Sequence, residues 1–299
     1  MTKRISVYVK NGINPNYRAF LHGAERIGAA KGVEIISRLP ETPDDVDQQI
    51  SLMQAELRGD LGGLPDGVLF NPTDDVALMP MVAQLNSARI PTINFINRIA
   101  GTFVSFVGGD EFRIGQSAMR YFLGVLGNEG NIAIIEGPAA APTARERLRG
   151  FHAALGEQPK VNFAASACGH YQRAGGYQAM QRILESSTPV DGVIAANDLM
   201  ALGALDALLE AKRSMLVMGS NGTVEAAHAI HEGRLLASVD YDGFKMGCIA
   251  TEAMLRHWNG ADIPHEILMP ATIVHKDNCA AWRVPIELRE PPVWEAVIG

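Results

Sequence analysis

Short apolar segments alternate with longer amphipathic segments along this chain, and the whole alternation occurs twice. The first series predicts strands over residues 6–9, 33–36, 67–70 and 92–95, with helices over residues 17–30, 46–57 and 76–85. After a glycine-containing stretch, the second series predicts strands over residues 131–135, 161–164, 192–195 and 215–219, with helices over residues 114–126, 145–155, 171–184 and 199–209. Strands that alternate with helices form parallel sheets with helices on both faces. We therefore predict an α/β protein with two doubly wound parallel-sheet lobes.

Length and charge limit the function. A chain of 299 residues is long enough for two lobes, each with its own core. Its net charge of -7, with no run rich in Lys or Arg, would repel a phosphate backbone, so we expect no nucleic-acid partner. The three cysteines lie far apart and form no CxxC pair, which predicts neither a structural metal nor a disulfide framework.

The sequence has no long apolar run of the kind that spans a bilayer. A strand is predicted to begin near Ile5, and no signal-peptide pattern precedes it. The location stays open at this stage, because a mature exported protein has lost that segment.

The ends of the predicted strands are rich in asparagine. Ligand-contacting residues of parallel α/β sheets lie in the loops at the carboxyl ends of the strands. An amide both donates and accepts hydrogen bonds, so several of them suit a ligand with many hydroxyl groups. The alternative is that each Asn only caps a helix or forms a turn, and we assign Asn11 and Asn71 to that structural role.

An ordered set of short motifs covers nearly the whole chain. These are Asn14-Pro-Asn-Tyr17, Asn71-Pro-Thr-Asp-Asp75, Ile90-Pro91, Thr143-Ala-Arg-Glu-Arg147 with Gly150-Phe151, Ala196-Asn-Asp-Leu-Met-Ala-Leu-Gly203 and Gly219-Ser-Asn-Gly-Thr223. In this order the set resembles the ribose/galactose type of periplasmic sugar-binding proteins, the solute-binding proteins of ABC transporters with the type I periplasmic binding fold.

The resemblance implies two Rossmann-like lobes joined by three hinge crossings, with one ligand in the cleft between them. The implied N-terminal lobe is residues 1–107 plus 241–274, and the implied C-terminal lobe is residues 108–240 plus 275–299. The crossings are expected near residues 106–110, 238–242 and 272–277. The resemblance also implies a monomer in the periplasm, without a cofactor or metal, that presents its closed form to the membrane subunits of an ABC permease.

The resemblance carries ligand-binding roles onto individual residues. Asn14, Asn16 and Tyr17 match the sugar-contacting segment of the first lobe, and a tyrosine ring can stack on sugar C–H groups. In the second lobe, Arg145 matches an arginine that donates hydrogen bonds to sugar oxygens. Tyr171 matches an aromatic residue that forms a wall of the site, and Asn197 matches a residue that hydrogen-bonds sugar hydroxyls. Tyr241 stands where the family often has Gln.

Two positions depart from the family pattern, because amides replace carboxylates there. Asn97-Arg98 stands near an expected Asp-Arg pair, and Asn221 replaces the Asp of a Gly-x-Asp-Gly motif. Since these replacements leave Arg98 and Arg145 without those carboxylate partners, we hypothesise that the ligand is a polyol, a deoxy or modified sugar, or a sugar acid, rather than plain ribose or galactose. The alternative is that the replacements only adjust affinity.

Other motifs carry less weight. Residues 108–112 spell Gly-Gly-Asp-Glu-Phe, the signature of diguanylate cyclases, which we interpret as coincidence because the surrounding sequence fits the start of the second lobe. His228 and His231 share one predicted helix, but no further ligand completes a metal site, so we predict a solvated helix face.

The alternative function is the effector-sensing portion of a LacI-type transcription regulator, which has the same two-lobed fold. A regulator needs a basic helix-turn-helix segment before Ile5, and the sequence shows none there. A sugar-converting enzyme is a third possibility, although we find no convincing pair of nucleophile and base. We therefore predict a receptor without catalytic activity.

Overall fold

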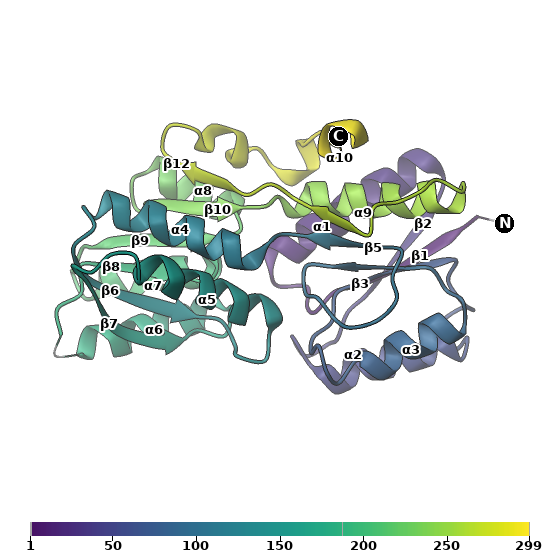
Figure 1. Ribbon diagram of the computed structural model, residues 1–299, viewed down its shortest axis with the longest axis horizontal. Coiled ribbons are helices and arrows are strands. Elements are labelled where there is room, and N and C mark those ends of the chain that lie inside the picture. Colours follow the sequence, from purple (N-terminus) through teal and green to yellow (C-terminus); the bar gives the residue numbers. More distant parts are fainter. Residues whose placement is uncertain (1, 187, 299) are drawn as a thin grey trace. The chain divides into compact units, whose positions relative to one another are not determined.

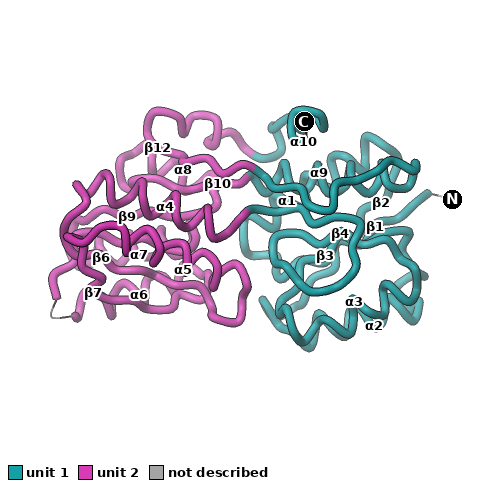
Figure 2. The backbone as a smooth tube through the Cα atoms, in the orientation of Figure 1, with its two compact units in different colours: residues 1–109, 242–269, 286–299 teal, residues 110–241, 270–285 magenta. Residues whose placement is uncertain are grey.

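The computed structural model describes residues 2–186 and 188–298. The chain forms two compact units (Figure 2). Unit 1 comprises residues 1–109, 242–269 and 286–299, and unit 2 comprises residues 110–241 and 270–285. The chain thus passes from one unit to the other four times.

Unit 1 contains a six-stranded parallel sheet (Figure 1). Its strands, in spatial order, are β11 (Glu266–Leu268), β5 (Ser105–Gly108), β4 (Thr92–Phe95), β3 (Gly67–Phe70), β1 (Arg4–Tyr8) and β2 (Glu34–Arg38). Strands β3, β4 and β5 are buried along their whole length, whereas the edge strands β2 and β11 carry exposed residues. This is the expected burial for a sheet with helices on both faces.

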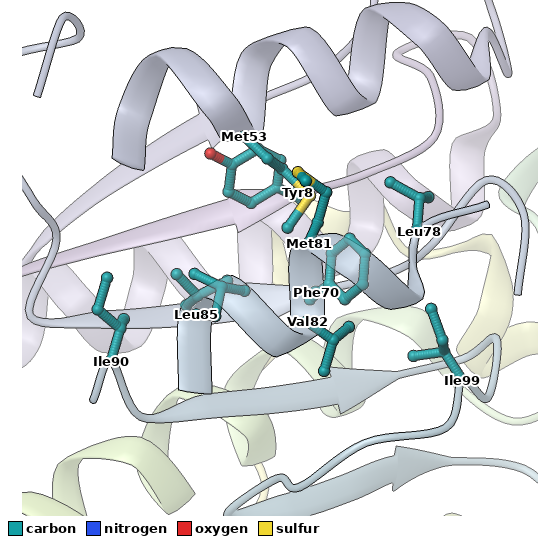
Figure 3. Close-up of a cluster of buried hydrophobic side chains, with 10 residues drawn as sticks. Tyr8, Met53, Phe70, Leu78, Met81, Val82, Leu85, Ile90 and Ile99 are labelled. Atoms are coloured by element: carbon teal, nitrogen blue, oxygen red, sulfur yellow. The ribbon is translucent and has the colours of Figure 1, made fainter. Parts of the chain in front are cut away.

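The helices of unit 1 pack in pairs. These are α1 (Pro15–Lys31) with α9 (Gly243–Trp258), and α2 (Val46–Leu57) with α3 (Met79–Ser87). Gly23 allows the close approach of α1 and α9, because a Cβ atom there would lie 2.1 Å from the carbonyl oxygen of Phe244. The α2–α3 pair buries its apolar side chains against Tyr8 and Phe70 of the sheet, as Figure 3 shows.

Unit 2 repeats this architecture with one change. Its sheet has the order β12 (Thr272–His275), β10 (Ala237–Asp240), β9 (Leu216–Ser220), β8 (Gly192–Ala195), β6 (Gly130–Glu136) and β7 (Val161–Cys168). Helix α4 (Glu111–Val125) packs on α5 (Pro142–Leu155), and α6 (Arg173–Glu185) packs on α7 (Asp198–Glu210). A further helix, α8 (Val224–His231), contacts the 3-10 helix η1 (Cys279–Arg283).

The prediction of two doubly wound α/β lobes is confirmed. The sheet of unit 2 is not wholly parallel, however, because β12 pairs with β10 in the antiparallel direction. Helix α9 and strand β11 of unit 1 lie between β10 and β12 in the sequence, so β12 is not the next strand of an alternating series within unit 2. The rule that applies to alternating strands and helices therefore does not cover β12.

The predicted lobe boundaries and the three expected crossings need correction. Residues 270–274, which include most of β12, belong to unit 2 and not to the first lobe, because β12 pairs with β10. The observed divisions fall after residues 109, 241, 269 and 285. The C-terminal segment from residue 286 onward belongs to unit 1 rather than to the second lobe, because Ile286 of the 3-10 helix η2 (Ile286–Leu288) packs on Ala19, Phe244 and Cys248. In the short C-terminal helix α10 (Trp294–Ile298), Glu295 pairs with Arg256.

Candidate functional site

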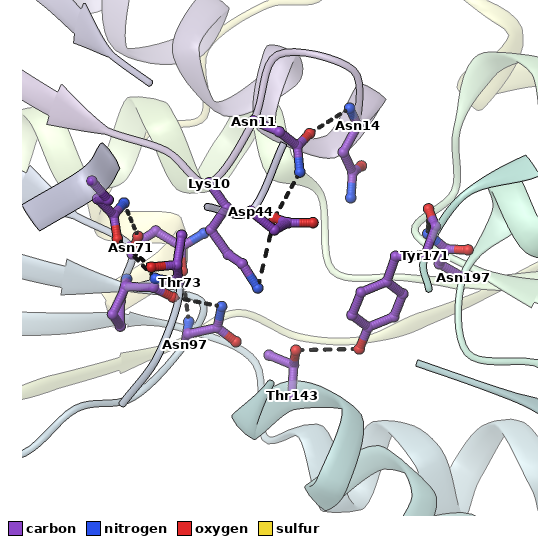
Figure 4. Close-up of polar contacts among 12 residues, drawn as sticks. Lys10, Asn11, Asn14, Asp44, Asn71, Thr73, Asn97, Thr143, Tyr171 and Asn197 are labelled. Atoms are coloured by element: carbon purple, nitrogen blue, oxygen red, sulfur yellow. Dashed lines mark hydrogen bonds and ion pairs between the residues drawn. The ribbon is translucent and has the colours of Figure 1, made fainter. Parts of the chain in front are cut away.

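Each unit gathers polar side chains at the carboxyl ends of its strands. We call the group in unit 1 cluster 1 and the group in unit 2 cluster 2, and Figure 4 shows members of both. Cluster 1 consists of Lys10, Asn11, Asn14, Asp44, Asn71, Thr73 and Asn97. Cluster 2 consists of Glu111, Thr143, Arg147, Tyr171, Asn197, Asn221 and Tyr241.

In cluster 1 a chain of amide contacts leads from β1 to the start of α1. Asn11 Nδ2 donates to Asp44 Oδ1 at 2.9 Å, and Asn11 Oδ1 accepts from the backbone N–H of Asn14 at 2.9 Å. Asn14 is the N-cap of α1, and its side chain accepts from the N–H of Asn16 at 2.9 Å. The loop is therefore held in place by its own side chains.

A buried lysine lies beside these asparagines. Lys10 is only 2% exposed, and its Nζ atom lies 4.0 Å from Asp44 Oδ1. Burial lowers the pKa of Lys10, and the nearby carboxylates of Asp44 and Asp74 oppose that shift.

Asn71 and Asn97 connect the ends of β3 and β4. The N–H of Asn97 donates to Asn71 Oδ1 at 3.2 Å, and Asn97 Nδ2 donates to the Pro72 carbonyl at 3.2 Å. Among the described residues, Asn71 Nδ2 and Asn97 Oδ1 are buried without a hydrogen-bond partner. One unsatisfied donor and one unsatisfied acceptor thus remain in this part of cluster 1, and such groups are rare in native proteins.

Arg147 and Glu111 form the charged centre of cluster 2. Arg147 Nε donates to Glu111 Oε2 at 3.0 Å, and Arg147 Nη1 donates to the carbonyl of Ala196. Arg147 Nη2 also donates to the hydroxyl of Tyr241 at 3.4 Å. Burial, the largest single effect, lowers the pKa of Arg147, but its interactions with Glu111, Tyr241 and Tyr171 together outweigh burial. The pKa is therefore raised, and the guanidinium stays charged.

Tyr171 is held in an unusual backbone conformation, with φ 58°. Its hydroxyl lies 3.3 Å from Thr143 Oγ1, and its carbonyl accepts from Asn197 Nδ2 at 3.0 Å. Its ring lies directly against Gly137, where a Cβ atom would be 2.5 Å from Tyr171 Cζ. Asn197 caps α7 with its other amide atom, which accepts from the N–H of Met200 at 2.9 Å.

Asn221 directly follows β9 and lies beside a buried carboxyl group. Its φ is 113°, and its Oδ1 atom is buried without a hydrogen-bond partner among the described residues. The neighbouring carboxyl of Asp198 accepts from Ser238 Oγ at 2.6 Å and from the N–H of Thr223 at 2.8 Å. Burial raises the pKa of Asp198 to about 7 although these two donors lower it.

The predicted site residues fall into two groups. Asn14 and Asn97 lie in cluster 1, and Tyr171, Asn197, Asn221 and Tyr241 lie in cluster 2. Asn16 and Tyr17 are buried on α1, where Asn16 Oδ1 lies close to Gly243 at the start of α9.

The two predicted arginines lie outside the buried clusters. Arg98 is exposed, pairs with Glu266 and stacks on the ring of Phe106 at 3.7 Å. Arg145 is exposed and donates to the carbonyls of Ala139 and Ala140, the latter at 2.8 Å. The premise that the arginines lack a carboxylate partner is therefore wrong for Arg98. For Arg98 the partner is Glu266, which is 168 positions away in the sequence.

Sequence reasoning missed the buried charged residues of both clusters. Lys10 directly follows the apolar run over residues 5–9. A lysine in that position could have indicated a buried charged residue at the end of the strand. Glu111 belongs to the Gly-Gly-Asp-Glu-Phe segment, where its carboxylate is the partner of Arg147.

Across the part of the chain that the structure describes, no group of three or more His, Cys, Asp or Glu side chains is arranged to hold a metal ion. Within the same residues, none of the helices combines the length and hydropathy that a bilayer crossing requires.

Comparison with known proteins agrees with this architecture. Residues 5–262 match the model of the periplasmic binding protein domain. The ribose import binding protein of Bacillus subtilis is 29% identical over 259 residues, which is 86% of this chain and 82% of that protein.

Two solved structures carry a bound sugar or polyol. One is an ABC transporter periplasmic solute binding protein of Actinobacillus succinogenes with bound D-allose, which has a TM-score of 0.87 and 25% identity and covers 94% of this chain and 100% of its own. The other is a solute binding protein of Bacillus halodurans with bound myo-inositol, with a TM-score of 0.86, 25% identity, and coverage of 94% of this chain and 97% of its own. With two doubly wound α/β units and a family match over residues 5–262, this chain belongs to the periplasmic binding protein family, a family of solute receptors.

Proposed function

We propose that this protein is the solute-binding receptor of an ABC importer and that it captures a sugar, a polyol or a sugar acid. The named relatives are a ribose import binding protein and solute-binding proteins that hold D-allose and myo-inositol. All three ligands are small and carry several hydroxyl groups.

The observation that carries the proposal is the presence of unpartnered amide atoms at the strand ends. Asn97 Oδ1 and Asn221 Oδ1 are buried and make no hydrogen bond within the described residues. A hydroxyl group can donate to an amide oxygen and accept from an amide nitrogen. A buried polar atom without a partner is costly, so a polyhydroxylated ligand that supplies these hydrogen bonds gains affinity.

In this proposal one ligand contacts both clusters and favours the closed arrangement of the two lobes through its higher affinity for that arrangement. The contacting residues are proposed to be Asn14, Asn16, Tyr17, Asn97, Arg98, Arg145, Tyr171, Asn197, Asn221 and Tyr241. The partner is an ABC permease, and the closed form is the signal that the permease recognises.

The remaining features of the proposal follow the family. We propose a monomer outside the cytoplasm that has no nucleic-acid partner and no catalytic activity. The relatives named here support an import receptor rather than the effector-sensing portion of a LacI-type regulator. Sedimentation velocity gives the oligomeric state, and a stable dimer would contradict the proposed monomer.

The test is a binding screen. Protein that has been unfolded and refolded to remove bound ligand is screened by thermal shift against pentoses, hexoses, polyols and sugar acids, and calorimetry confirms each hit. A ligand at 100 times its dissociation constant adds about 2.7 kcal/mol to the stability of the folded state. Binding without turnover supports the proposal, and the absence of binding in every class contradicts it.

A pair of alanine variants separates the site from the remaining surface. Asn97→Ala is expected to weaken binding by about tenfold, because Asn97 is a proposed ligand contact. Asn86→Ala, an exposed asparagine on α3, is the matched control and is expected to keep the wild-type dissociation constant.

A further inference from the structure

The chain passes from unit 2 to unit 1 at two places (Figure 2). At the first, Asp240 ends β10 in unit 2 and Phe244 lies in the first turn of α9 in unit 1. At the second, Trp282 of η1 belongs to unit 2 and Ile286 of η2 belongs to unit 1. Both connections are therefore short, and both lead from unit 2 to unit 1.

The two connections are attached to each other at both ends. In unit 2, Trp282 Nε1 donates to Asp240 Oδ2 at 2.6 Å. In unit 1, Ile286 packs on the apolar cluster of Ala19, Phe244 and Cys248. The ends of the second connection are thus fixed to the same two elements, β10 and α9, that the first connection joins.

The second connection is stiff as well as short. Val284 has an extended backbone, with φ -70° and ψ 127°, and Pro285 follows it. Proline fixes its own φ and restricts the residue before it to extended conformations. A stiff segment with both ends attached limits the conformations of the connection that shares its attachment points.

The first connection contains a backbone conformation that needs such support. Asp242 has φ 56°, a left-handed conformation that is uncommon for residues other than glycine. A residue keeps this conformation only where the surrounding structure holds it. Because the chain passes between the units at Tyr241 and Asp242, closure of the lobes in the proposed function changes the torsion angles of these residues.

Two proposed ligand contacts depend on the end of β10. One of them, Tyr241, directly follows Asp240. The other is Asn221, whose N–H donates to the carbonyl of Val239 at 2.7 Å. A Cβ atom on Gly222 would overlap the side chain of Asp240, so the loop that carries Asn221 lies directly against that residue. A shift of Asp240 would therefore move both ligand contacts.

We propose that Trp282 is a positioning residue for ligand binding. Together with Ile286 it restrains the crossing at residues 240–244 and so holds Asn221 and Tyr241 in their binding arrangement. The inference rests on the proposed receptor function and adds to it a residue outside the proposed ligand contacts. A restrained crossing leaves the ligand-free protein fewer conformations, so less conformational entropy is lost on binding. Loosening the restraint is therefore expected to weaken binding.

The experiment compares wild type with Trp282→Phe, which keeps an aromatic ring but removes the donor to Asp240. Pro285→Gly is the second variant, because it loosens the connection and leaves both attachments in place. The matched controls are Trp258→Phe on α9 and Pro291→Gly in the C-terminal segment. Calorimetry measures the dissociation constants for ribose, D-allose and myo-inositol, and hydrogen exchange measures the opening of residues 238–244 without ligand.

Trp282→Phe and Pro285→Gly are each expected to weaken binding of the tightest of these probes by about tenfold and to speed hydrogen exchange in residues 238–244. Both controls should keep the wild-type affinity and the wild-type exchange. Thermal melting without ligand verifies that each variant is folded. A bond that only stabilised unit 2 would lower the melting temperature without changing the affinity of the folded protein.

A folded Trp282→Phe variant that keeps the wild-type affinity within twofold would overturn the inference and leave the receptor function intact. If Trp282→Phe did not fold, the same result for Pro285→Gly would overturn it. Failure of wild type to bind any sugar, polyol or sugar acid is a different outcome, because it would contradict the receptor function itself. Hydrogen exchange would then decide on the restraint, since unchanged exchange in the variants would overturn it.

Discussion

Arg147 donates from two guanidinium nitrogens to the same carboxylate oxygen of Glu111, and both side chains are buried in unit 2. The other oxygen, Glu111 Oε1, has no partner among the described residues. The pair connects the first turn of α4 to α5, and through Arg147 it reaches Ala196 and Tyr241. Stability and site geometry therefore depend on the same two side chains.

Glu111→Gln is expected to lower the free energy of unfolding by about 3–5 kcal/mol, because it leaves a buried guanidinium without its counter-charge. Urea denaturation measures this loss. Glu146→Gln is the control, since Glu146 pairs with Arg149 at the surface and its removal is expected to cost less than about 1 kcal/mol. Equal losses for the two variants would contradict the assigned role of the buried pair.

Asp198 makes stability depend on pH. Burial raises the pKa of its carboxyl to about 7, whereas an unfolded Asp titrates near about 3.9. The contribution of Asp198 to stability is thus fully present below about pH 3.9 and is lost as pH rises to about 7. Between pH 5 and pH 8 wild type should lose roughly 2–3 kcal/mol relative to Asp198→Asn, as measured by urea denaturation at both pH values. The control is Glu185→Gln, an exposed change on α6, which should show the wild-type dependence of stability on pH. If the free energies of unfolding of wild type and Asp198→Asn changed equally with pH, Asp198 would not be the cause of the pH dependence.

Asn221 allows backbone strain to be separated from ligand binding. At φ 113° a side chain is strained and glycine is not, so Asn221→Gly should be more stable than Asn221→Ala by roughly 1–3 kcal/mol in thermal or urea unfolding. Both variants lack the amide, so both should lose the same affinity for a sugar that wild type binds. Unequal affinities would mean that the loop conformation, and not the amide, determines binding at this position.

Cys248 is expected to be chemically inert in the folded protein. Burial raises the pKa of its thiol to about 12, so almost no thiolate is present at neutral pH. Cys279 is also buried, whereas Cys168 is partly exposed near His170. A thiol reagent such as DTNB should therefore label one cysteine in the native state and all three in urea.

The variant Cys168→Ser provides the check on that labelling experiment. It should abolish the native-state reaction and leave two thiols that react only after unfolding. Rapid labelling of two thiols in native wild type would show that unit 1 or unit 2 opens around a buried cysteine.

The repeated alternation of apolar and amphipathic segments was enough to predict both sheets and most helices, because hydrophobic periodicity is a local property. The same holds for the asparagines at the strand ends, since the carboxyl ends of parallel strands meet at one edge of the sheet. Asn14 and Asn197 also perform the capping role that the sequence offered as an alternative, because each caps the helix that follows it.

Partnerships between distant residues could not be predicted in this way. Glu111 and Arg147 are 36 positions apart, and Arg98 and Glu266 are 168 positions apart. Whether an arginine lines a site or pairs at the surface depends on which helix or strand packs beside it.

The amino-acid sequence by itself determined the fold class and the polar edge of each sheet. Only the tertiary structure decided that Lys10 is buried near Asp44, that Arg98 is paired with Glu266, and that the segment after residue 285 belongs to unit 1. The physical reason is that local periodicity specifies which face of an element is apolar. Burial, charge pairing and the packing of a terminal segment depend on contacts that form only when the whole chain has folded.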